Sequence, residues 1–484
     1  MKLAATIAAA GLSLAVAVPA AAATPAPADW QPVVSNNPAR IGMYDTISQP
    51  VSTTGVFAEL PTTDIPAPGP GSLTWNAAAE SLSWRNGPAV TVNPAVSASY
   101  TLREPGGGQT SPATIEVAVT AGGLPAQSTS DTLTVTRAPA SAGFGDIYRD
   151  TPRGSALFRG NLYLGFEVSG PAPLHVGEVW RTADGVTWVP GAPVGFSASA
   201  HVQHVDTFIV FGGELYAGTD NGEIWRTSDG TLWTQVPSPS GNDENVTAFA
   251  IFHGLLYANQ AANGHPGGVF RTANGTDWSA VFTYPASQPQ LEYTHDLTLF
   301  AGSLFSQVGS YKGFLGPGGG DLASSADGTT WQALAQPGFG DLANTDISGF
   351  AVFRGALYAG TFNPTQGAQV WRTTDGQTWQ QVAANGFGDP GNTVVHELIV
   401  FGGQLYAGTE NDVEGGEVWR TSDGTHWSLA SVPGFGEPHS QVMRIRTFFR
   451  LGGYLYAGGE DDCEVAPAAC QQNGFELWRL SSVN

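Results

Sequence analysis

One stretch near the C-terminus carries the pattern that decides the fold. Residues 397–409 read ELIVFGGQLYAGT, and residues 416–430 read GEVWRTSDGTHWSLA. Apolar and polar residues alternate in both segments, β-branched and aromatic residues are frequent, and Gly and Asp interrupt the alternation. A period of two is typical of a strand with one buried face. The stretch therefore predicts about four antiparallel strands joined by tight turns.

The same pattern recurs seven times from about residue 143 onward. A complete copy has an apolar strand ending in F-x-G, then L-Y-A-G-T, a variable loop, V-W-R, a turn and a short last strand, and the third and fourth copies are the most degenerate. The F-x-G position is occupied by Phe158, Phe211, Phe252, Phe300, Phe353 and Phe401, with Leu451 in the last copy. Repeats of 40–50 residues with four strands predict an all-β, seven-bladed β-propeller. A helical solenoid can have a similar period, but apolar residues recur at no helical spacing after the N-terminal segment.

Six of the repeats have a turn of the form T/S-x-D-G-x-x-W, with Asn274 in place of the Asp in one of them; the tryptophans are Trp188, Trp233, Trp278, Trp331, Trp379 and Trp427. The acidic side chain can accept backbone hydrogen bonds, the glycine tolerates positive φ, and the tryptophan packs over the hairpin. This turn resembles the Asp-box of the BNR-repeat propellers, which include sialidases, xyloglucanases and sortilin-type receptors. The chain lacks one residue between Asp and Gly that those proteins have. The resemblance implies the fold and not the function, because Asp-boxes lie away from the ligand face in those proteins.

The last repeat ends after Trp478 and Arg479 without the turn or a fourth strand. The segment Arg137–Asp146, RAPASAGFGD, precedes the first repeat and matches segments that follow other fourth strands. We expect this segment to pair with the strand around Trp478, which closes the ring and removes an exposed sheet edge.

The N-terminal third divides into three parts. Residues 1–23 predict a cleaved secretory signal peptide, because Lys2 precedes an apolar stretch and small residues offer a cleavage site. Residues 24–49 are rich in Pro, Ala and Ser and predict a linker. Residues 50–136 hold short alternating strands that resemble bacterial immunoglobulin-like modules, which implies a small β-sandwich with Trp75, Trp84 and Tyr100 in its core. The propeller then spans residues 137–484.

Charge excludes two classes of partner. The chain has 41 acidic and 19 basic residues, a net charge of -22, and only 12% charged residues, against roughly 25% in ordinary soluble domains. Nucleic acids and anionic membranes need a basic surface, so neither is expected as a partner. No later stretch is long and apolar enough for a membrane helix. We expect a secreted monomer, extracellular or periplasmic, without a cofactor, whose partner is an extracellular glycan or cell-surface ligand.

Candidate site residues come from aligning the first strands of the repeats. Five positions before F-x-G stand Arg153, Asp206, Thr247, His295, Ser348, His396 and Arg446; seven positions before it stand Thr151, His204, Asn245, Tyr293, Asp346, Val394 and Arg444. With a period of two, both sets face the same side of their strands. They predict a polar mouth at the start of the inner strands, where propellers commonly bind ligands.

Arginines gather where the first and last repeats meet. Arg149, Arg153, Arg444 and Arg446 predict a binding site for a carboxylate or sulfate, because guanidinium groups bind such anions bidentately. His204 and Asp346 join them as binding candidates, while His295, His396, Tyr293 and Asp206 are candidate acid-base groups. The alternative is that these residues are solvated or ion-paired with neighbouring carboxylates.

Other motifs are weaker. His201, His204 and Asp206 do not share a strand face, and the acidic loops Glu410–Glu414 and Glu460–Glu464 lack the spacing of a known calcium loop, so no metal site is predicted. Residues 148–152 match a motif of the first sialidase blade only loosely. We therefore assign no sialidase catalytic role to any residue of this chain.

Two functions therefore stay open. The first is a secreted enzyme that cleaves an acidic, uronate-type polysaccharide at the propeller mouth by lyase or hydrolase chemistry. His, Tyr and Arg suit a lyase, whereas a glycosidase needs two carboxyl groups, which Asp206 with Asp346 or Glu397 would supply. The second is a non-catalytic propeller that binds an extracellular carbohydrate or protein.

Cys463 and Cys470 are the only cysteines, and they lie close together in the last repeat. In an oxidising compartment we expect them to form a local disulfide. Thiol titration of the denatured, unreduced protein should then detect no free thiol, whereas two titratable thiols would contradict the pairing.

Overall fold

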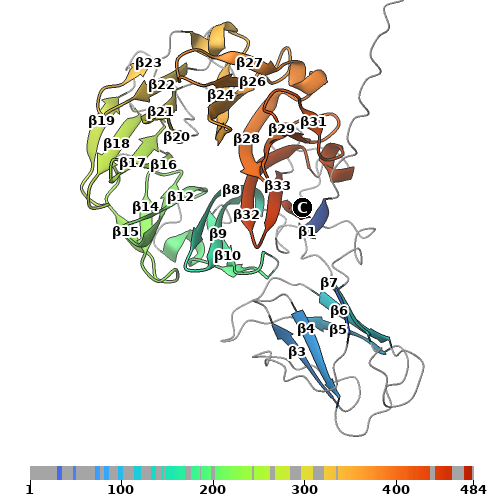
Figure 1. Ribbon diagram of the computed structural model, residues 1–484. Coiled ribbons are helices and arrows are strands. Elements are labelled where there is room, and N and C mark those ends of the chain that lie inside the picture. Colours follow the sequence, from blue (N-terminus) through green and yellow to red (C-terminus); the bar gives the residue numbers. More distant parts are fainter. Residues whose placement is uncertain are drawn as a thin grey trace, which may run out of the picture.

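The computed structural model is an all-β fold whose first strands surround one axis (Figure 1). It describes residues 30–34, the strands between 47 and 137, residue 144, and residues 149–168, 176–185, 187–197, 202–241, 245–261, 267–283, 296–308, 321–333, 336–436, 442–460 and 474–481. No helix among these residues is long and apolar enough to cross a membrane.

Each predicted repeat forms an antiparallel sheet of consecutive strands. Four of these sheets consist of β8 (Arg149–Phe158), β9 (Asn161–Val168), β10 (Glu178–Thr182) and β11 (Val189–Pro190); β12 (Val205–Phe211), β13 (Glu214–Thr219), β14 (Ile224–Thr227) and β15 (Thr234–Val236); β16 (Val246–Phe252), β17 (Leu255–Gln260), β18 (Gly268–Thr272) and β19 (Ser279–Thr283); and β20 (Leu297–Phe300), β21 (Ser303–Val308), β22 (Asp321–Ser325) and β23 (Gln332–Ala333).

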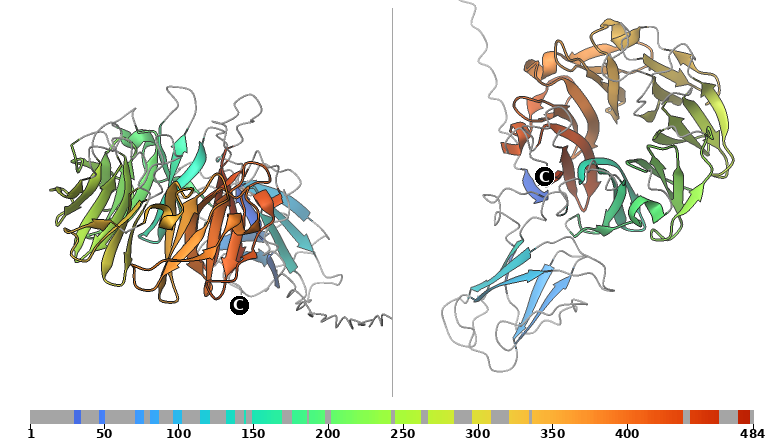
Figure 2. Two further views of the ribbon diagram at one scale, coloured as in Figure 1. Left: turned by 90° about the horizontal axis from the view of Figure 1, so that it is seen from above. Right: turned by 180° about the vertical axis from the view of Figure 1, so that it is seen from behind.

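The remaining repeats follow the same strand order, although a few pairings link them into one larger sheet. They consist of β24 (Asp346–Phe353), β25 (Ala356–Phe362), β26 (Val370–Thr373) and β27 (Gln380–Ala383); β28 (Val394–Phe401), β29 (Gln404–Glu410), β30 (Val418–Thr421) and β31 (Ser428–Leu429); and β32 (Arg444–Leu451), β33 (Tyr454–Glu460) and β34 (Glu476–Ser481). Four-stranded antiparallel sheets arranged in a ring are the architecture of a β-propeller (Figure 2), as the repeat predicts.

The turn motif works as the sequence predicts. The Asp229 carboxylate accepts hydrogen bonds from the backbone N–H groups of Thr231 at 2.7 Å and Leu232 at 2.8 Å. Gly230 has φ of +85°, and a Cβ there would lie 2.0 Å from the hydroxyl of Tyr163 in the preceding sheet. That hydroxyl donates to the Gly230 carbonyl at 3.0 Å. The glycine therefore permits both the turn and the close approach of the neighbouring sheet.

The G-F-G segments between sheets form a second regular contact. Within the described residues, short 3-10 turns of this kind are η2 (Val194–Ser197), η4 (Pro337–Gly340), η5 (Asn385–Gly388) and η6 (Pro433–Gly436). The phenylalanine of each turn packs on the tryptophan of the V-W-R, I-W-R or L-W-R strand of the next sheet, as in Phe196 on Trp225 at 4.9 Å and Phe387 on Trp419 at 4.9 Å. Phe144 makes the equivalent contact with Trp180 at 4.5 Å.

The strand that completes the last sheet is not the expected one. Gln31–Val34, within the predicted linker, forms β1 and pairs antiparallel with β34, with Pro32 opposite Trp478. β34 is paired on its other side with β33, so Arg137–Asp146 cannot pair there. The prediction is wrong because Phe144, which the G-F-G match located, packs between sheets rather than extending one.

Trp30, just before β1, takes the place of the missing turn tryptophan. It is 6% exposed, its ring lies 5.4 Å from that of Phe435, and its Nε1–H donates to the Ala430 carbonyl at 3.0 Å. Trp233 makes the corresponding contacts with the segment that follows the preceding sheet, with Phe196 at 5.2 Å and the Gly191 carbonyl at 2.9 Å.

The N-terminal module is described as strands only. β2 (Ile47–Pro50), β7 (Thr132–Arg137), β6 (Thr114–Thr120) and β5 (Val96–Thr101) form one antiparallel sheet in that order, and β3 (Gly71–Asn76) pairs with β4 (Ser81–Asn86). The side chains of Trp75, Trp84 and Tyr100 lie outside the described part of the structure.

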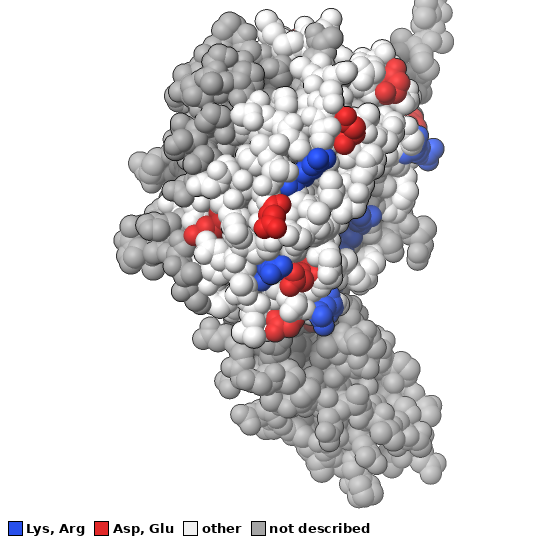
Figure 3. All heavy atoms as spheres, turned by 90° about the vertical axis from the view of Figure 1, so that its left-hand side faces the viewer, with Lys and Arg blue, Asp and Glu red and all other residues white. Residues whose placement is uncertain are grey.

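The visible outer face of the propeller is sparsely charged. Figure 3 shows isolated basic and acidic side chains separated by wide uncharged areas, with no basic stripe on this face.

We predict that Trp30→Ala lowers the free energy of unfolding by about 3–5 kcal/mol, because it leaves a cavity beside Phe435 and removes the bond to Ala430. Urea unfolding followed by tryptophan fluorescence measures the change. Leu232→Ala is the control, since Leu232 is 77% exposed. Equal stability of the two variants would contradict a structural role for Trp30.

Candidate functional site

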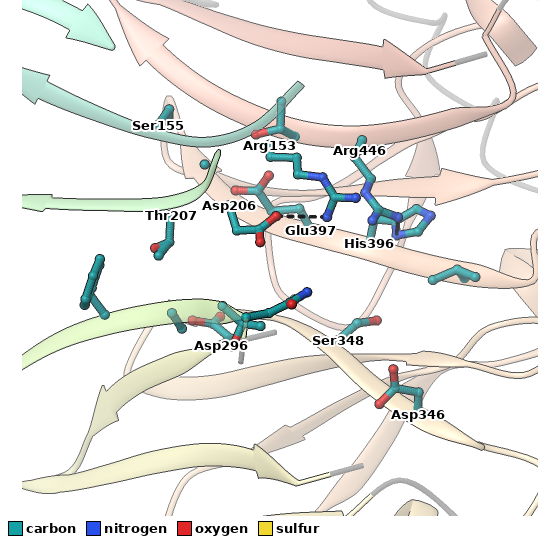
Figure 4. Close-up of a pocket in the computed structure, with 18 of the residues that line it drawn as sticks. Arg153, Ser155, Asp206, Thr207, Asp296, Asp346, Ser348, His396, Glu397 and Arg446 are labelled. Carbon is teal, nitrogen blue, oxygen red and sulfur yellow. Dashed lines mark hydrogen bonds and ion pairs between the residues drawn. The ribbon is translucent and has the colours of Figure 1, made fainter. Parts of the chain in front are cut away.

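A polar cavity of about 360 Å³ lies where the first strands of the sheets meet. Its lining includes Arg153 from β8, Asp206 from β12, Ser348 from β24, His396 from β28 and Arg446 from β32. We call this cavity the axial pocket. Figure 4 shows Arg153 and Arg446 next to each other with Asp206, Glu397 and His396 around them, while Asp296 and Asp346 enter from the strands opposite.

A bulge in the inner strands brings two consecutive residues into the axial pocket. The pairing of β28 with β29 shifts between Val395 and Glu397, and the pairing of β32 with β33 shifts between Ile445 and Thr447. Similar shifts occur in β8, β12, β16 and β24. A bulge places an extra residue on one strand and breaks the alternation of faces. His396 and Glu397, for example, therefore both line the pocket.

The pocket gathers part of the predicted site. Arg153, Asp206, Asp346, His396 and Arg446 line it. Arg149, Arg444 and His204 are not among its lining residues; their side chains contact Glu178, Glu410 and Glu167 instead. His295 and Tyr293 lie outside the described residues, as do Cys463 and Cys470, so their predicted roles stay predictions.

The arginines of the pocket are ion-paired with carboxylates. Arg153 contacts Glu167 and lies 3.2 Å from Asp206, while Arg446 lies 3.7 Å from Glu460. Glu167 and Glu460 belong to β9 and β33, the second strands of the first and last sheets. These pairs favour the ion-paired alternative over an open anion site.

The two arginines outside the pocket are paired in the same way. Arg444 lies 2.9 Å from Glu410 and 3.2 Å from Glu460. Arg149 lies 2.8 Å from Glu178 and 4.8 Å from the Trp180 ring centroid. Both arginines are 6% exposed, so they reinforce contacts within and between sheets.

Both ring nitrogens of His396 have protein partners. Nε2 lies 2.8 Å from Oε2 of Glu410, and Nδ1 lies 3.4 Å from Nη1 of Arg446. Burial lowers the pKa of His396 and so favours the neutral ring. We assign the proton to Nε2, which then donates to Glu410 while Nδ1 accepts from Arg446. Burial opposes ionisation of Glu410, but His396 and Arg444 outweigh it and lower the pKa of Glu410 to about 2. The imidazole is therefore a positioning group within an ion-paired network.

His204 has a different role from the one predicted. Its Nε2 lies 3.1 Å from Oε1 of Glu167. Burial and the charge of Arg153 oppose its protonation, but Glu167 outweighs them and raises the pKa of His204. His204 thus supports the Glu167 and Arg153 pair from behind the pocket wall.

Two acids of the pocket stand at a position that the alignment of the first strands did not select, although the sequence offered Glu397 as an alternative second carboxyl group. Asp296, just before β20, and Glu397 on β28 stand four positions before F-x-G. Strict alternation would place this position on the strand face opposite to the preceding residue, which is the one predicted to face the mouth. The signal that could have located them is the pair of consecutive polar residues His295-Asp296 and His396-Glu397, which violates the period of two and marks a bulge.

The environment of these acids favours their neutral forms. Burial, with a smaller contribution from the charge of Asp296, outweighs the hydrogen bonds from Phe448 and Thr447 and raises the pKa of Glu397 to about 8. Burial likewise raises the pKa of Asp296 to about 6. Glu397 accepts a hydrogen bond from the backbone N–H of Phe448 at 2.6 Å, on the neighbouring sheet. Burial also raises the pKa of Asp346, whose carboxyl accepts a hydrogen bond from Gln307.

Among the described residues, no group of three or more His, Cys, Asp or Glu side chains is placed to hold a metal ion. The axial pocket therefore offers hydrogen-bonding carboxyl groups and paired arginines as its chemical groups.

No protein-family model matches the chain, and no curated protein matches it. Its similar solved structures are β-propellers. The computationally designed Ika8 protein is 11% identical, with a TM-score of 0.39 over 69% of this chain and 97% of that one. YCF48 bound to D1 peptide is 14% identical, with a TM-score of 0.44 over 69% and 93%. PorZ, a surface component of the type-IX secretion system of Porphyromonas gingivalis, is 12% identical, with a TM-score of 0.46 over 76% and 51%.

We predict that the stability of the protein falls as the pH rises through the pKa of Glu397. The pKa is about 8 in the folded protein, above the ordinary value of 4.5, so the folded state holds a proton that the unfolded chain releases. The resulting loss of stability is absent below pH 4.5, grows as the pH rises, and is complete above about pH 8. Glu397→Gln should therefore stabilise the protein at pH 8 by about 3–5 kcal/mol, and by much less at pH 5.5.

Urea unfolding at the two pH values measures this difference. Glutamine can still accept the Phe448 hydrogen bond, so the packing of the neighbouring sheets is retained. A stability difference that does not change with pH would contradict the raised pKa.

Proposed function

We propose that the propeller has seven blades built from Asp-box-type repeats, with β1 completing the last blade. The recurring turn geometry and the position of Trp30 support this arrangement. We further propose that residues 50–136 form an immunoglobulin-like module and that the protein is secreted, as its N-terminal sequence predicts.

We propose that the protein is a glycan hydrolase whose active site is the axial pocket. One observation carries this proposal: Glu397 and Asp296, with pKa values of about 8 and about 6, share the pocket with Asp206, which is ion-paired with Arg153. Glycoside hydrolysis requires one carboxyl group that gives a proton and a second that stays ionised. Acids placed in such different environments are suited to these two tasks.

Glu397 is the general acid in this proposal. Its raised pKa keeps the carboxyl protonated at neutral pH, so it can protonate the oxygen of the leaving sugar. Asp206 is the carboxylate that faces the sugar ring or its attacking water, and Arg153 stabilises its negative charge. The charge of Asp296 adds to the burial that raises the pKa of Glu397.

The structure weakens two features of the sequence-based hypothesis. A lyase with His396 as base loses support because both imidazole nitrogens are engaged by Glu410 and Arg446. A uronate-type substrate loses support because Arg153 and Arg446 already face carboxylates. Hydrolysis of a hydroxyl-rich glycan is the function that agrees best with this arrangement.

The second candidate is a propeller that binds a glycan without cleaving it. One observation favours it: Glu397 accepts the backbone N–H of Phe448, and Asp296 accepts that of Phe350. Both bonds satisfy backbone groups beside a bulge, which is a structural task for the same carboxyl groups.

We predict that Glu397→Gln reduces glycan hydrolysis by about 10²–10⁴-fold, because glutamine has no proton to transfer. A panel of neutral, amino and uronate polysaccharides is assayed for new reducing ends with the unmodified protein. The variant is then compared on the best substrate.

Glu414→Gln is the matched control, because Glu414 is exposed and lies outside the pocket lining. It should retain full activity. No new reducing ends from any polysaccharide, or full activity of Glu397→Gln, would contradict the hydrolase and favour the binding protein.

A further inference from the structure

The axial pocket has more acidic than basic groups. Its charged lining consists of Arg153 and Arg446 against Asp206, Asp296, Asp346 and Glu397, with His396 neutral. In addition, Glu167 pairs with Arg153 and Glu460 with Arg446 from outside the lining. Positive charge in the pocket is therefore fully compensated by carboxylates, whereas the acids Asp296, Asp346 and Glu397 have no basic partner among the described ion pairs.

Asp206 has unused hydrogen-bonding capacity. Its side chain is 8% exposed, and neither carboxylate oxygen accepts a hydrogen bond from the described residues. Oδ1 lies 3.2 Å from Nη1 of Arg153, while Oδ2 has no ion pair of its own in the described part of the chain. A buried carboxylate oxygen without donors is costly, and such groups in a pocket mark the place where a ligand supplies the donor.

We propose that the axial pocket takes a glycan bearing a free primary amine, an unacetylated amino sugar, with its ammonium group beside Asp206. This inference rests on the proposed function, which names a glycan as the ligand. It adds that this glycan carries a positive charge. An ammonium group has three donors and no acceptor, which matches a carboxylate that lacks donors. A uronate would instead place its carboxylate beside the carboxylate of Asp206, and this contact between like charges is unfavourable.

Proton release is a second consequence of this assignment. A cation that enters the pocket favours the ionised forms of Asp296 and Glu397, both of which burial holds partly or fully protonated at neutral pH. Binding of an amino sugar should therefore release protons to the buffer. A neutral sugar produces no such electrostatic effect.

Isothermal titration calorimetry of the unmodified full chain tests the assignment. The probes are oligomers of glucosamine, N-acetylglucosamine and glucuronic acid of equal length. They are titrated at pH 5.5, where the amino groups are ammonium ions and Asp296 and Glu397 are still largely protonated, in two buffers of different ionisation enthalpy. We expect the glucosamine oligomer to bind at least tenfold more tightly than its acetylated form, with net proton release, and the glucuronate oligomer to bind most weakly.

Two variants locate the effect. Asp206→Asn should reduce the preference for the free amine at least fivefold, whereas Glu414→Gln should leave it unchanged. Circular dichroism and melting of each variant confirm folding, and the comparison of probes on the unmodified protein decides the question even if Asp206→Asn does not fold.

Equal affinity for the free and acetylated oligomers, tighter binding of glucuronate, or a preference that Asp206→Asn retains would overturn the inference. Each result is separable from the hydrolase proposal. If the protein cleaves a neutral glycan and this cleavage requires Glu397, the hydrolase proposal is supported and the preference for a free amine is contradicted. If glucosamine oligomers bind tightly and release protons but are not cleaved, the preference for a free amine is supported and the hydrolase proposal is contradicted.

Discussion

The contact between a tyrosine of one sheet and the turn glycine of the next is the constraint on which the ring depends. Tyr163 touches Gly230, Tyr216 touches Gly275, and Tyr456 of the last sheet touches Gly185 of the first. Each glycine has positive φ and leaves no space for a Cβ, so the turn and the spacing between sheets are determined together. That spacing in turn decides how close the first strands, and hence the groups of the axial pocket, come to one another.

The repeat made most of the fold predictable, because its alternation, turn residues and length all indicate the same four-stranded unit. The bulges were harder to predict, since a single inserted residue leaves the apolar pattern on either side intact. His396 and Glu397 face the same cavity for this reason, although alternation assigns them to opposite faces. β1 was missed for another reason: Gln31–Val34 is only four residues long and lies far from the repeats. Its partner is determined by a tertiary contact and not by local sequence.

The groups of the pocket are also structural elements of the ring. Glu397 and Asp296 accept backbone N–H groups of the following sheets, and the arginines at the junction of the first and last sheets pair with second-strand carboxylates. The same buried charged groups therefore hold the sheets together and line the proposed binding site. A site of this kind is held rigidly, because its side chains are oriented by contacts within and between sheets. Glu397, Asp296 and Asp346 have raised pKa values because the fold removes them from water.

β1 also has a consequence for the order in which the chain folds. Trp30 bonds to Ala430 across 400 residues of chain, one of the most distant contacts in the molecule. Such a contact closes a very long loop, so it forms late and slowly compared with the hairpins inside each repeat. Until the last repeat has been made, the first strand has no partner, and until the first strand docks, β34 presents an open edge to other chains. The period between completion of the chain and docking of β1 is therefore the stage at which this protein is most exposed to aggregation and to strand exchange with a second copy.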